Sequence, residues 1–332
     1  MPETLRKLVA GALVRDLRAS AAALMAPLQL GIGVPNACER LLHALEAQLA
    51  AAPDESVLLL DYKNAFSRIS RAAARAFIDR VFPSLTPHLT ATYGGEPPAV
   101  YGWAAGDDDT GDDRGGGGGR AARSGDDSAA AGGGGSPLRP SQTADGAATA
   151  RPPNWVPPPP TRLLLLVERG TQQGDPLGPF LHAAAMMLVL LRVASLHPDH
   201  VVDAFHDDVR AVGPVEGLGA VMATAARVGA LVDAQLAPEK CAAWSPATAA
   251  PPPDLTDQWR SEGVVQFSIP VGGAAFVTEH VATIVANHAA GVAAIVALPE
   301  GELQTKLLLL RLCDGPRATY ALRCLPPDAG AT

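Results

Sequence analysis

Apolar positions in the first part of the chain repeat mainly with the period of an α-helix. In residues 5–17, leucines and a valine recur three or four positions apart, which predicts an amphipathic helix. A second helix is expected over 36–51, with Asn36 as its N-cap and Pro53 just beyond its end. Helical spacing returns over 66–82, where four arginines occupy the more polar side. Three helices are therefore expected in this part.

Short apolar runs predict strands in both halves of the chain. The run 57–60 has the length of a buried strand, and so does the run 163–167. The runs 201–205 and 209–212 are separated by three polar residues, so we expect them to pair as a tight hairpin. A further strand is expected over 264–271, directly before two glycines.

The remaining segments are either helical or of low complexity. Apolar helical patterns cover 176–194, 215–235, 279–297 and 301–313. The stretch 94–160 is different, because it consists largely of Gly, Asp and Pro runs. Such a composition buries too little apolar surface to offset the entropy of ordering the chain. We therefore expect this stretch to be a disordered insertion that interrupts one fold.

Composition and charge limit the classes of partner. The net charge is −8, from 34 acidic and 26 basic residues, so a nucleic-acid surface would have to be a local arginine patch. The apolar runs are too short to cross a bilayer, and the N-terminus has no signal-peptide pattern. We therefore expect an intracellular protein without a membrane segment, in either the nucleus or the cytoplasm.

Carboxylates stand at the ends of two predicted apolar strands. Asp61 closes the run 57–60, and Asp207 and Asp208 lie at the expected hairpin tip. Charges beside an apolar strand are costly unless a partner neutralises them, and Mg²⁺ prefers carboxylate and phosphate oxygens. Paired aspartates are also common in solvated turns. The residues alone therefore leave a metal site and an ordinary turn as alternatives.

Four motifs occur in a fixed order along the chain. The segment 60–66 (LDYKNAF) has an Asp, then three other residues, then Ala and an aromatic residue. The segment 173–177 reads QGDPL, 205–208 reads FHDD, and 236–241 (LAPEKC) contains a Lys near its end. A lead-in at 27–31 (PLQLG) precedes them. This ordered set resembles the reverse transcriptase domain of retrotransposons, the non-LTR type of RNA-directed DNA polymerase.

The resemblance implies an α+β fold with a polymerase palm, an antiparallel sheet with helices packed on one face. Residues 1–93 would form partial fingers and the first half of the palm, and 161–275 its second half. The insertion 94–160 would lie between these halves, and 276–332 would be a helical, thumb-like part. The fingers are expected to be partial, because the Arg-Pro pair that the family carries before the segment resembling 5–8 is absent.

The resemblance also implies catalytic roles. Asp61 and Asp207 would be the main ligands of two Mg²⁺ or Mn²⁺ ions, with Asp208 as a supporting carboxylate. Phe66 would lie under the sugar of the incoming nucleotide and exclude a 2′-hydroxyl by its bulk. From its position in the sequence alone, Phe66 could equally be a core aromatic of the predicted helix.

Further residues would contact the substrates. Gln173 and Gly174 would shape the template and nucleotide pocket, Lys240 would act near the pyrophosphate, and Arg169 would touch the template phosphate. The alternatives are a simple turn before a helix, a surface lysine and a solvated arginine. His182 is expected to be a packing or surface residue.

The function implied is template-directed DNA synthesis by two-metal nucleotidyl transfer. Its partners would be an RNA or DNA template with a primer, and deoxynucleoside triphosphates. Two alternatives from other classes remain open. One is a catalytically inactive remnant that folds and at most binds nucleic acid, and the other is an interaction protein built around the insertion.

Overall fold

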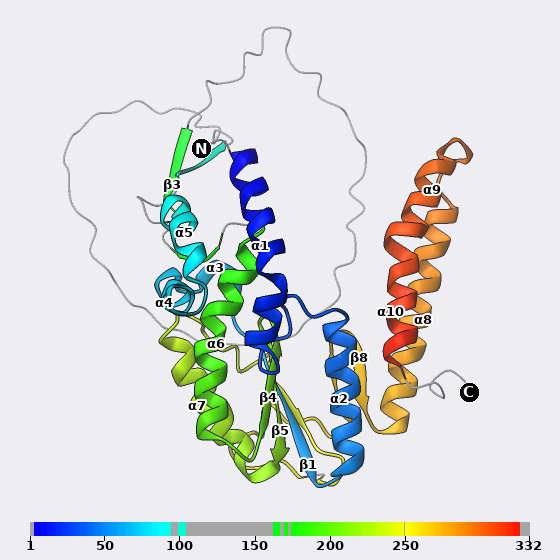
Figure 1. The fold of residues 1–332 in the computed structure, drawn as a ribbon. Coiled ribbons are helices and arrows are strands. Elements are labelled where there is room, and N and C mark those ends of the chain that lie inside the picture. The colour runs from blue at the N-terminus through cyan, green and yellow to red at the C-terminus, as the bar shows by residue number, and fades with distance from the viewer. Residues whose placement is uncertain are drawn as a thin grey trace, which may run out of the picture. The chain divides into compact units, whose positions relative to one another are not determined.

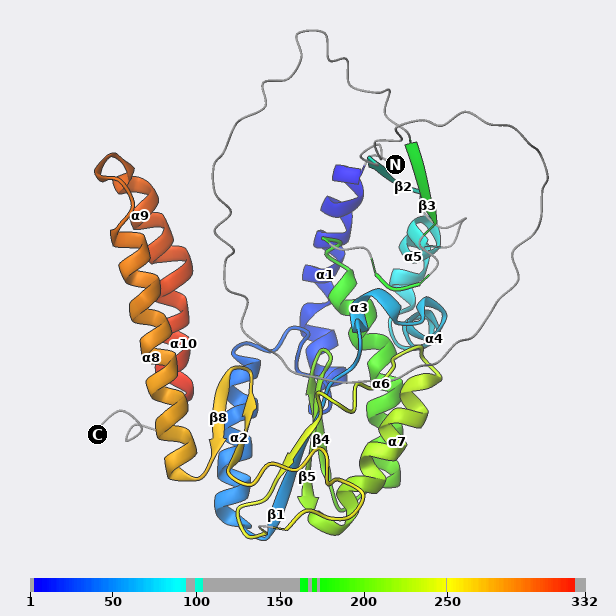
Figure 2. The same ribbon diagram turned by 180° about the vertical axis from the view of Figure 1, so that it is seen from behind.

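The computed structural model describes residues 3–93, 99–103, 162–166, 169–171, 174–248 and 250–325. The chain divides into two compact units, of which the larger comprises residues 1–98 and 167–332 and the smaller residues 99–166. Figure 1 shows the ribbon, and Figure 2 shows it from behind.

The larger unit is built on a four-stranded sheet with the strand order β4-β5-β1-β6. Its strands are β1 (Glu55–Leu60), β4 (Val201–Phe205), β5 (Asp208–Pro214) and β6 (Ala242–Trp244). All three pairings are antiparallel. The α+β class and the antiparallel sheet are therefore confirmed. The three-residue strand β6 was not predicted, because it is too short to show a period.

Helices cover both faces of this sheet. They are α2 (Ala37–Ala51), α6 (Gly178–Leu196) and α7 (Leu218–Ala230), the last preceded by the 3-10 turn η2 (Val215–Gly217). In β1, Leu58 belongs to the core that contains α6 and α7, and its neighbour Val57 to a second core that contains α2. Successive residues of a strand face opposite sides. Helices therefore lie on both faces, and the expectation of helices on one face is wrong (Figure 1). The apolar run in β1 fits this burial on both faces.

A helical layer continues from α6. It contains α1 (Glu3–Met25), α4 (Arg71–Val81), the 3-10 turn η1 (Pro83–Leu85) and α5 (Thr86–Tyr93). Helix α4 packs along α6, and α5 packs against α4. Helix α6 is buried along most of its length, as its uniformly apolar sequence indicates. Helix α5 was not predicted.

The helix expected over 66–82 is broken in two. A short helix, α3 (Ala65–Arg68), ends before Ser70, whose hydroxyl accepts a hydrogen bond from the Ala73 N–H at 3.3 Å and caps α4. A serine in this position satisfies a free N–H of the first helical turn. Asn36, the expected cap of α2, does not act in this way, because it has a φ of 53° and makes no side-chain capping bond.

The strand expected over 264–271 is a hairpin. Its strands are β7 (Gly263–Gln266) and β8 (Ile269–Gly272), and the turn residues Phe267 and Ser268 both have positive φ. Two consecutive left-handed residues form the type of turn that matches the twist of paired strands. The turn contains none of the usual Asn or Gly residues, so a break in the strand was not predicted there.

The C-terminal part of the larger unit is helical. Its elements are α8 (Ala274–Val296), the 3-10 turn η3 (Glu300–Glu302), α9 (Leu303–Leu309), the π-helical segment η4 (Leu310–Asp314) and α10 (Gly315–Cys324). Helix α8 begins earlier than predicted, and the helix expected over 301–313 continues through η4 into α10. Helix α8 contacts α9, η4 and β8, and α10 contacts α2.

Among the residues that the structure describes, two helices are long and apolar enough to cross a membrane, by length and composition alone. They are α6, whose apolar 18-residue stretch is 61% buried, and α8, whose corresponding stretch is 6% buried. The expectation of a protein without a membrane segment stays a prediction. Such helices are weak evidence for a membrane, because the core helix of a soluble protein passes the same test.

The smaller unit contains one described hairpin. Strands β2 (Ala99–Trp103) and β3 (Arg162–Leu166) pair antiparallel, with Ala99 opposite Leu166. Strand β3 was predicted, but β2 falls inside the stretch expected to be disordered. Its Val, Tyr and Trp residues favour a strand locally, within a stretch of otherwise low complexity. The rest of 94–160 lies outside the described residues.

Candidate active site

The turn between β4 and β5 carries two of the predicted carboxylates. Phe205 pairs with Asp208, so His206 and Asp207 form a two-residue turn, and the predicted tight hairpin is confirmed. His206 has a φ of 56°, in the left-handed region. Asp207 is half-buried at the tip, and Asp208 is exposed at the start of β5. The two carboxylates therefore have different surroundings.

A buried amide fixes this turn. Gln29 is fully buried, and its Oε1 accepts hydrogen bonds from the backbone N–H of His206 at 2.7 Å and of Gly31 at 2.9 Å. Its Nε2 donates to the His206 carbonyl at 3.0 Å. The lead-in segment 27–31 therefore holds both backbone polar groups of one turn residue. The motif was recognised from the sequence, but this role of Gln29 was not predicted.

Gln29→Leu is expected to lower the free energy of unfolding by about 1–3 kcal/mol, because it leaves backbone groups of the half-buried His206 and Gly31 unpaired. Equilibrium unfolding in urea measures this change. The control is Gln48→Leu, at a half-buried position where the amide donates to the Glu55 carboxylate. Equal losses in the two variants would show that Gln29 does not hold the turn.

Asp61 is brought to the same edge of the sheet. The last residue pair between β1 and β5 is Leu60 with Val209, so Asp61 and Asp208 leave this pairing side by side. The two segments are far apart in the sequence, and the antiparallel register joins them. The structure thus brings together the three aspartates that the motifs singled out.

Lys240 also reaches this edge. Tyr62 forms an isolated antiparallel bridge with Leu236, and the N–H of Ala237 donates to the Asp61 carbonyl at 2.8 Å. This pairing ties the segment 236–241 to the residue after β1. As a result, the Lys240 ammonium lies 3.7 Å from Oδ1 of Asp61. Both side chains remain accessible, with exposed fractions of 61% and 40%.

The carboxylates influence each other electrostatically. Loss of hydration against the surrounding protein, with the nearby Asp207 and Asp61, raises the pKa of Asp208 to about 6. The pKa of Asp207 is also raised, first by loss of hydration and further by Asp61. Both shifts mean that negative charge at this edge is costly. A bound cation would offset that cost.

The donor chemistry fits Mg²⁺ or Mn²⁺, which prefer carboxylate oxygens. Among the residues that the structure describes, however, no group of three or more His, Cys, Asp or Glu side chains is arranged to hold a metal ion. Asp207 and Asp208 are consecutive, and consecutive side chains entering a strand point to opposite sides. Burial is the main cause that raises the pKa of Cys38 to about 11, and the charge of Asp208 is the next. The metal site therefore stays a prediction.

Phe66 lies beside the carboxylate turn in an aromatic cluster. Its ring stacks on the ring of His182 from α6, with centroids 4.4 Å apart and an interplanar angle of 23°. The ring of His206 lies 5.9 Å from that of Phe66, tilted by 57°. Phe66 is half-buried, so it is not a fully enclosed core residue. The stack with His182 joins positions with no recognisable spacing and was not predicted.

Arg169, the predicted template contact, stands on the segment that precedes α6. It is exposed, and its Nη1 is 3.4 Å from Oδ1 of Asp233. The adjoining backbone nevertheless reaches the Phe66 region. Thr171 donates its N–H to the Phe66 carbonyl at 2.8 Å, and Gly170 donates to the Ile69 carbonyl at 3.0 Å. The segment is thus attached to α3, while the Arg169 side chain is paired with Asp233.

The turn before α6 contains a buried carboxylate that was not predicted as a site residue. Gly174 has a φ of 79°, which favours glycine, and Gln173 lies outside the described residues. Asp175 is buried and accepts hydrogen bonds from Arg6 Nη1 at 2.6 Å and from the Tyr93 hydroxyl. These contacts fix the start of α1 to this turn.

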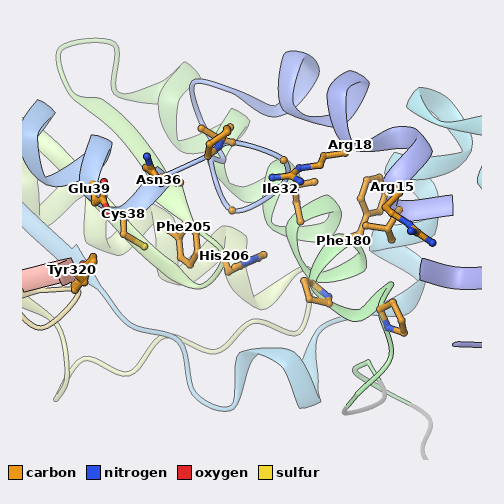
Figure 3. Close-up of a pocket in the computed structure, with 18 residues that line it drawn as sticks. Arg15, Arg18, Ile32, Asn36, Cys38, Glu39, Phe180, Phe205, His206 and Tyr320 are labelled. Carbon is orange, nitrogen blue, oxygen red and sulfur yellow. The ribbon is translucent and has the colours of Figure 1, made fainter. Parts of the chain in front are cut away.

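A groove of about 830 Å³ opens beside the β4–β5 turn. Arg15 and Arg18 of α1 line it, together with Phe205, His206 and Tyr320 of α10. In Figure 3, Phe205 and His206 lie between Tyr320 and the two arginines. The groove therefore joins a local pair of cations to the turn that carries Asp207. Such a surface could accept a nucleic-acid backbone despite the net negative charge of the chain.

Comparison with known proteins adds little to these observations. No protein-family profile and no curated protein matches the chain. Eleven chains of solved structures are similar. One is apo telomerase from Candida tropicalis, truncated from its C-terminal domain, with 8% identity and a TM-score of 0.49, covering 82% of this chain and 44% of that one.

Another similar structure is telomerase from Candida albicans in complex with a TWJ fragment of telomeric RNA. The identity is 10% and the TM-score 0.40, over 81% of this chain and 36% of that one. This chain thus spans less than half the length of either telomerase chain. A likeness at these scores carries no argument about activity, substrate or partner.

Proposed function

We propose that this chain is a template-directed DNA polymerase of the reverse transcriptase type. The observation that supports it best is the β1–β5 register, which brings Asp61 to the edge that carries Asp207 and Asp208. Lys240 and Phe66 lie at the same edge. Five residues that the sequence motifs single out are thereby gathered around one turn.

The reaction would join a primer 3′-hydroxyl to an incoming deoxynucleotide and release pyrophosphate. When bound, two Mg²⁺ or Mn²⁺ ions supply activation of the hydroxyl and neutralisation of the leaving group. Asp61 and Asp207 would hold them, with Asp208 as a supporting carboxylate. Lys240 places a positive charge beside Asp61, where it would stabilise charge on the departing pyrophosphate.

Phe66 would select the sugar of the incoming nucleotide. Phe66→Ala is expected to raise the efficiency of ribonucleotide addition, relative to deoxynucleotide addition, by at least about tenfold, because it opens space for a 2′-hydroxyl. Single-nucleotide addition to a primer measures both efficiencies. Phe66→Tyr keeps the ring and is expected to keep the selection. Unchanged selection in Phe66→Ala would reject the gate role.

The groove beside the turn would bind the template–primer. Replacing both Arg15 and Arg18 by Gln is expected to reduce the dependence of log affinity on log salt concentration by roughly 1.5–2, the effect of losing two phosphate contacts. Fluorescence anisotropy with a labelled primer–template measures it. The control is Arg192→Gln, an exposed arginine that does not line the groove. An equal salt dependence in both variants would exclude the groove as the binding surface.

The alternative is a catalytically inactive chain that binds nucleic acid. The lack of a converging metal-ligand group among the described residues favours it. Primer extension on an RNA template with four deoxynucleotides separates the two functions. Products whose sequence is complementary to the template support the polymerase. Binding without extension, by protein shown to be folded, supports the alternative, and neither binding nor extension contradicts both.

A further inference from the structure

A histidine that the proposed reaction does not use lies directly behind the proposed sugar gate. His182 is fully buried in α6, and neither ring nitrogen has a hydrogen-bond partner among the residues that the structure describes. Burial, with a smaller contribution from His206, lowers the pKa of His182 to about 3. The ring is therefore neutral at ordinary pH. The contacts that orient the His182 ring are those of its face and edge with the rings of Phe66 and His206.

That ring contacts both parts of the proposed nucleotide site. Its face stacks on Phe66, 4.4 Å between centroids and 23° between planes. It meets the ring of His206 at 6.5 Å and 63°, an edge arrangement. Stacked and edge-to-face pairs at such distances are favourable beyond the area that they bury. His182 thus links the Phe66 ring to the turn that precedes Asp207.

The supports of Phe66 and His182 differ in rigidity. Phe66 stands on α3, a four-residue helix that begins after Asn64 in a left-handed conformation and ends at an extended Ile69. His182 stands in the nineteen-residue helix α6, where its neighbours Leu181 and Ala183 are also buried. A short helix positions a side chain poorly by itself, since few backbone hydrogen bonds hold it. The buried His182 ring provides a fixed surface behind Phe66.

We propose that His182 is a positioning residue that fixes the plane of the Phe66 ring and thereby sets the discrimination between deoxynucleotides and ribonucleotides. The inference rests on the proposed polymerase function and deepens it. Without the His182 ring, a space opens behind Phe66, into which that ring can tilt or withdraw. A displaced ring leaves room for a 2′-hydroxyl, so selection weakens although Phe66 is still present.

The test measures kcat/KM for addition of a matched deoxynucleotide and of the corresponding ribonucleotide to a primer. His182→Ala is expected to lower the ratio of the two values by about threefold to tenfold, the size expected for one lost aromatic pair. His182→Phe restores a flat ring and is expected to keep the ratio within about twofold of the parent. A merely structural role would lower both kcat/KM values together and leave their ratio unchanged.

A double-mutant comparison isolates the path of the effect. In a Phe66→Ala background, His182→Ala is expected to cause no further change in the ratio, because the ring that it positions is gone. If His182→Ala does not fold, His182→Leu fills much of the space but offers no flat face to stack on Phe66, so it is expected to lower the ratio in the same direction by a smaller factor. A full His182 effect in the Phe66→Ala background would overturn the proposal.

The remaining outcomes separate this inference from the proposed function. If the parent adds deoxynucleotides but the ratio is unchanged in folded His182→Ala, or in His182→Leu, the positioning role alone is overturned. If the folded parent adds no nucleotide, the polymerase function is overturned, and the role of His182 in selection is overturned with it.

Discussion

Asp207→Asn is expected to lower the rate of primer extension by on the order of a thousandfold or more. The substitution keeps the size of the side chain and removes its charge at the tip of the β4–β5 turn. Bound divalent cations supply several kcal/mol of transition-state stabilisation, and each 1.36 kcal/mol lost is about a tenfold loss in rate. Single-turnover extension of a labelled primer on an RNA template measures the change.

The matched control for that substitution is Asp199→Asn. Asp199 is an exposed carboxylate just before β4, at the opposite end of the strand from the turn. The Asp199→Asn variant is expected to extend primers at a rate close to that of the parent. Equal rates for Asp207→Asn and the parent would contradict the catalytic role of Asp207, whereas equal losses in both variants would indicate a general effect of charge.

Arg210→Met is expected to cause the largest loss of stability, roughly 3–5 kcal/mol, because it leaves a buried carboxylate without its partner. Arg210 is 1% exposed, and its Nη2 donates to Oδ2 of Asp203 at 2.7 Å across the β4–β5 pair. Its Nη1 donates to the Leu41 carbonyl and, at 3.5 Å, to the Gln266 side chain. One guanidinium thus links the hairpin to α2 and β7.

Urea unfolding of Arg210→Met beside Arg75→Met measures this contribution. Arg75 forms an i,i+4 pair with Asp79 on the surface of α4, where an ion pair contributes little. Replacing Asp203 as well, in the double variant Arg210→Met with Asp203→Leu, is expected to recover part of the loss, because no buried charge remains. Similar stabilities for Arg210→Met and Arg75→Met would show that the buried pair does not hold the hairpin.

The sequence predicted the centre of the fold better than its margins. The runs 57–60, 201–205 and 209–212 are short and mainly apolar, and the last two flank the polar residues 206–208, so their strands and the hairpin were expected. The second face of the sheet was not, because an apolar run does not show which elements cover it. The turn at Phe267 and Ser268 was missed because it lacks the Asn or Gly that usually occupies left-handed turn positions.

The candidate site was predicted in its motif residues and not in its supports. Asp61, Asp207 and Lys240 stand in recognisable patterns, and the sheet register brings them to one edge. The roles of Gln29 and His182 depend on contacts between distant segments, which spacing along the chain does not reveal. The template contact expected of Arg169 stays a prediction, and its exposed side chain lies 3.4 Å from that of Asp233.

The most direct test of the central claim measures the binding of Mn²⁺ at the edge that carries Asp61 and Asp207. Electron paramagnetic resonance detects the bound ion. The parent is compared with a variant that carries both Asp61→Asn and Asp207→Asn, in the presence of a deoxynucleoside triphosphate. The proposal predicts that the parent binds Mn²⁺ at least about a hundredfold more tightly than the variant. Equal affinities would contradict a cation site at these carboxylates, and with it nucleotidyl transfer at this edge.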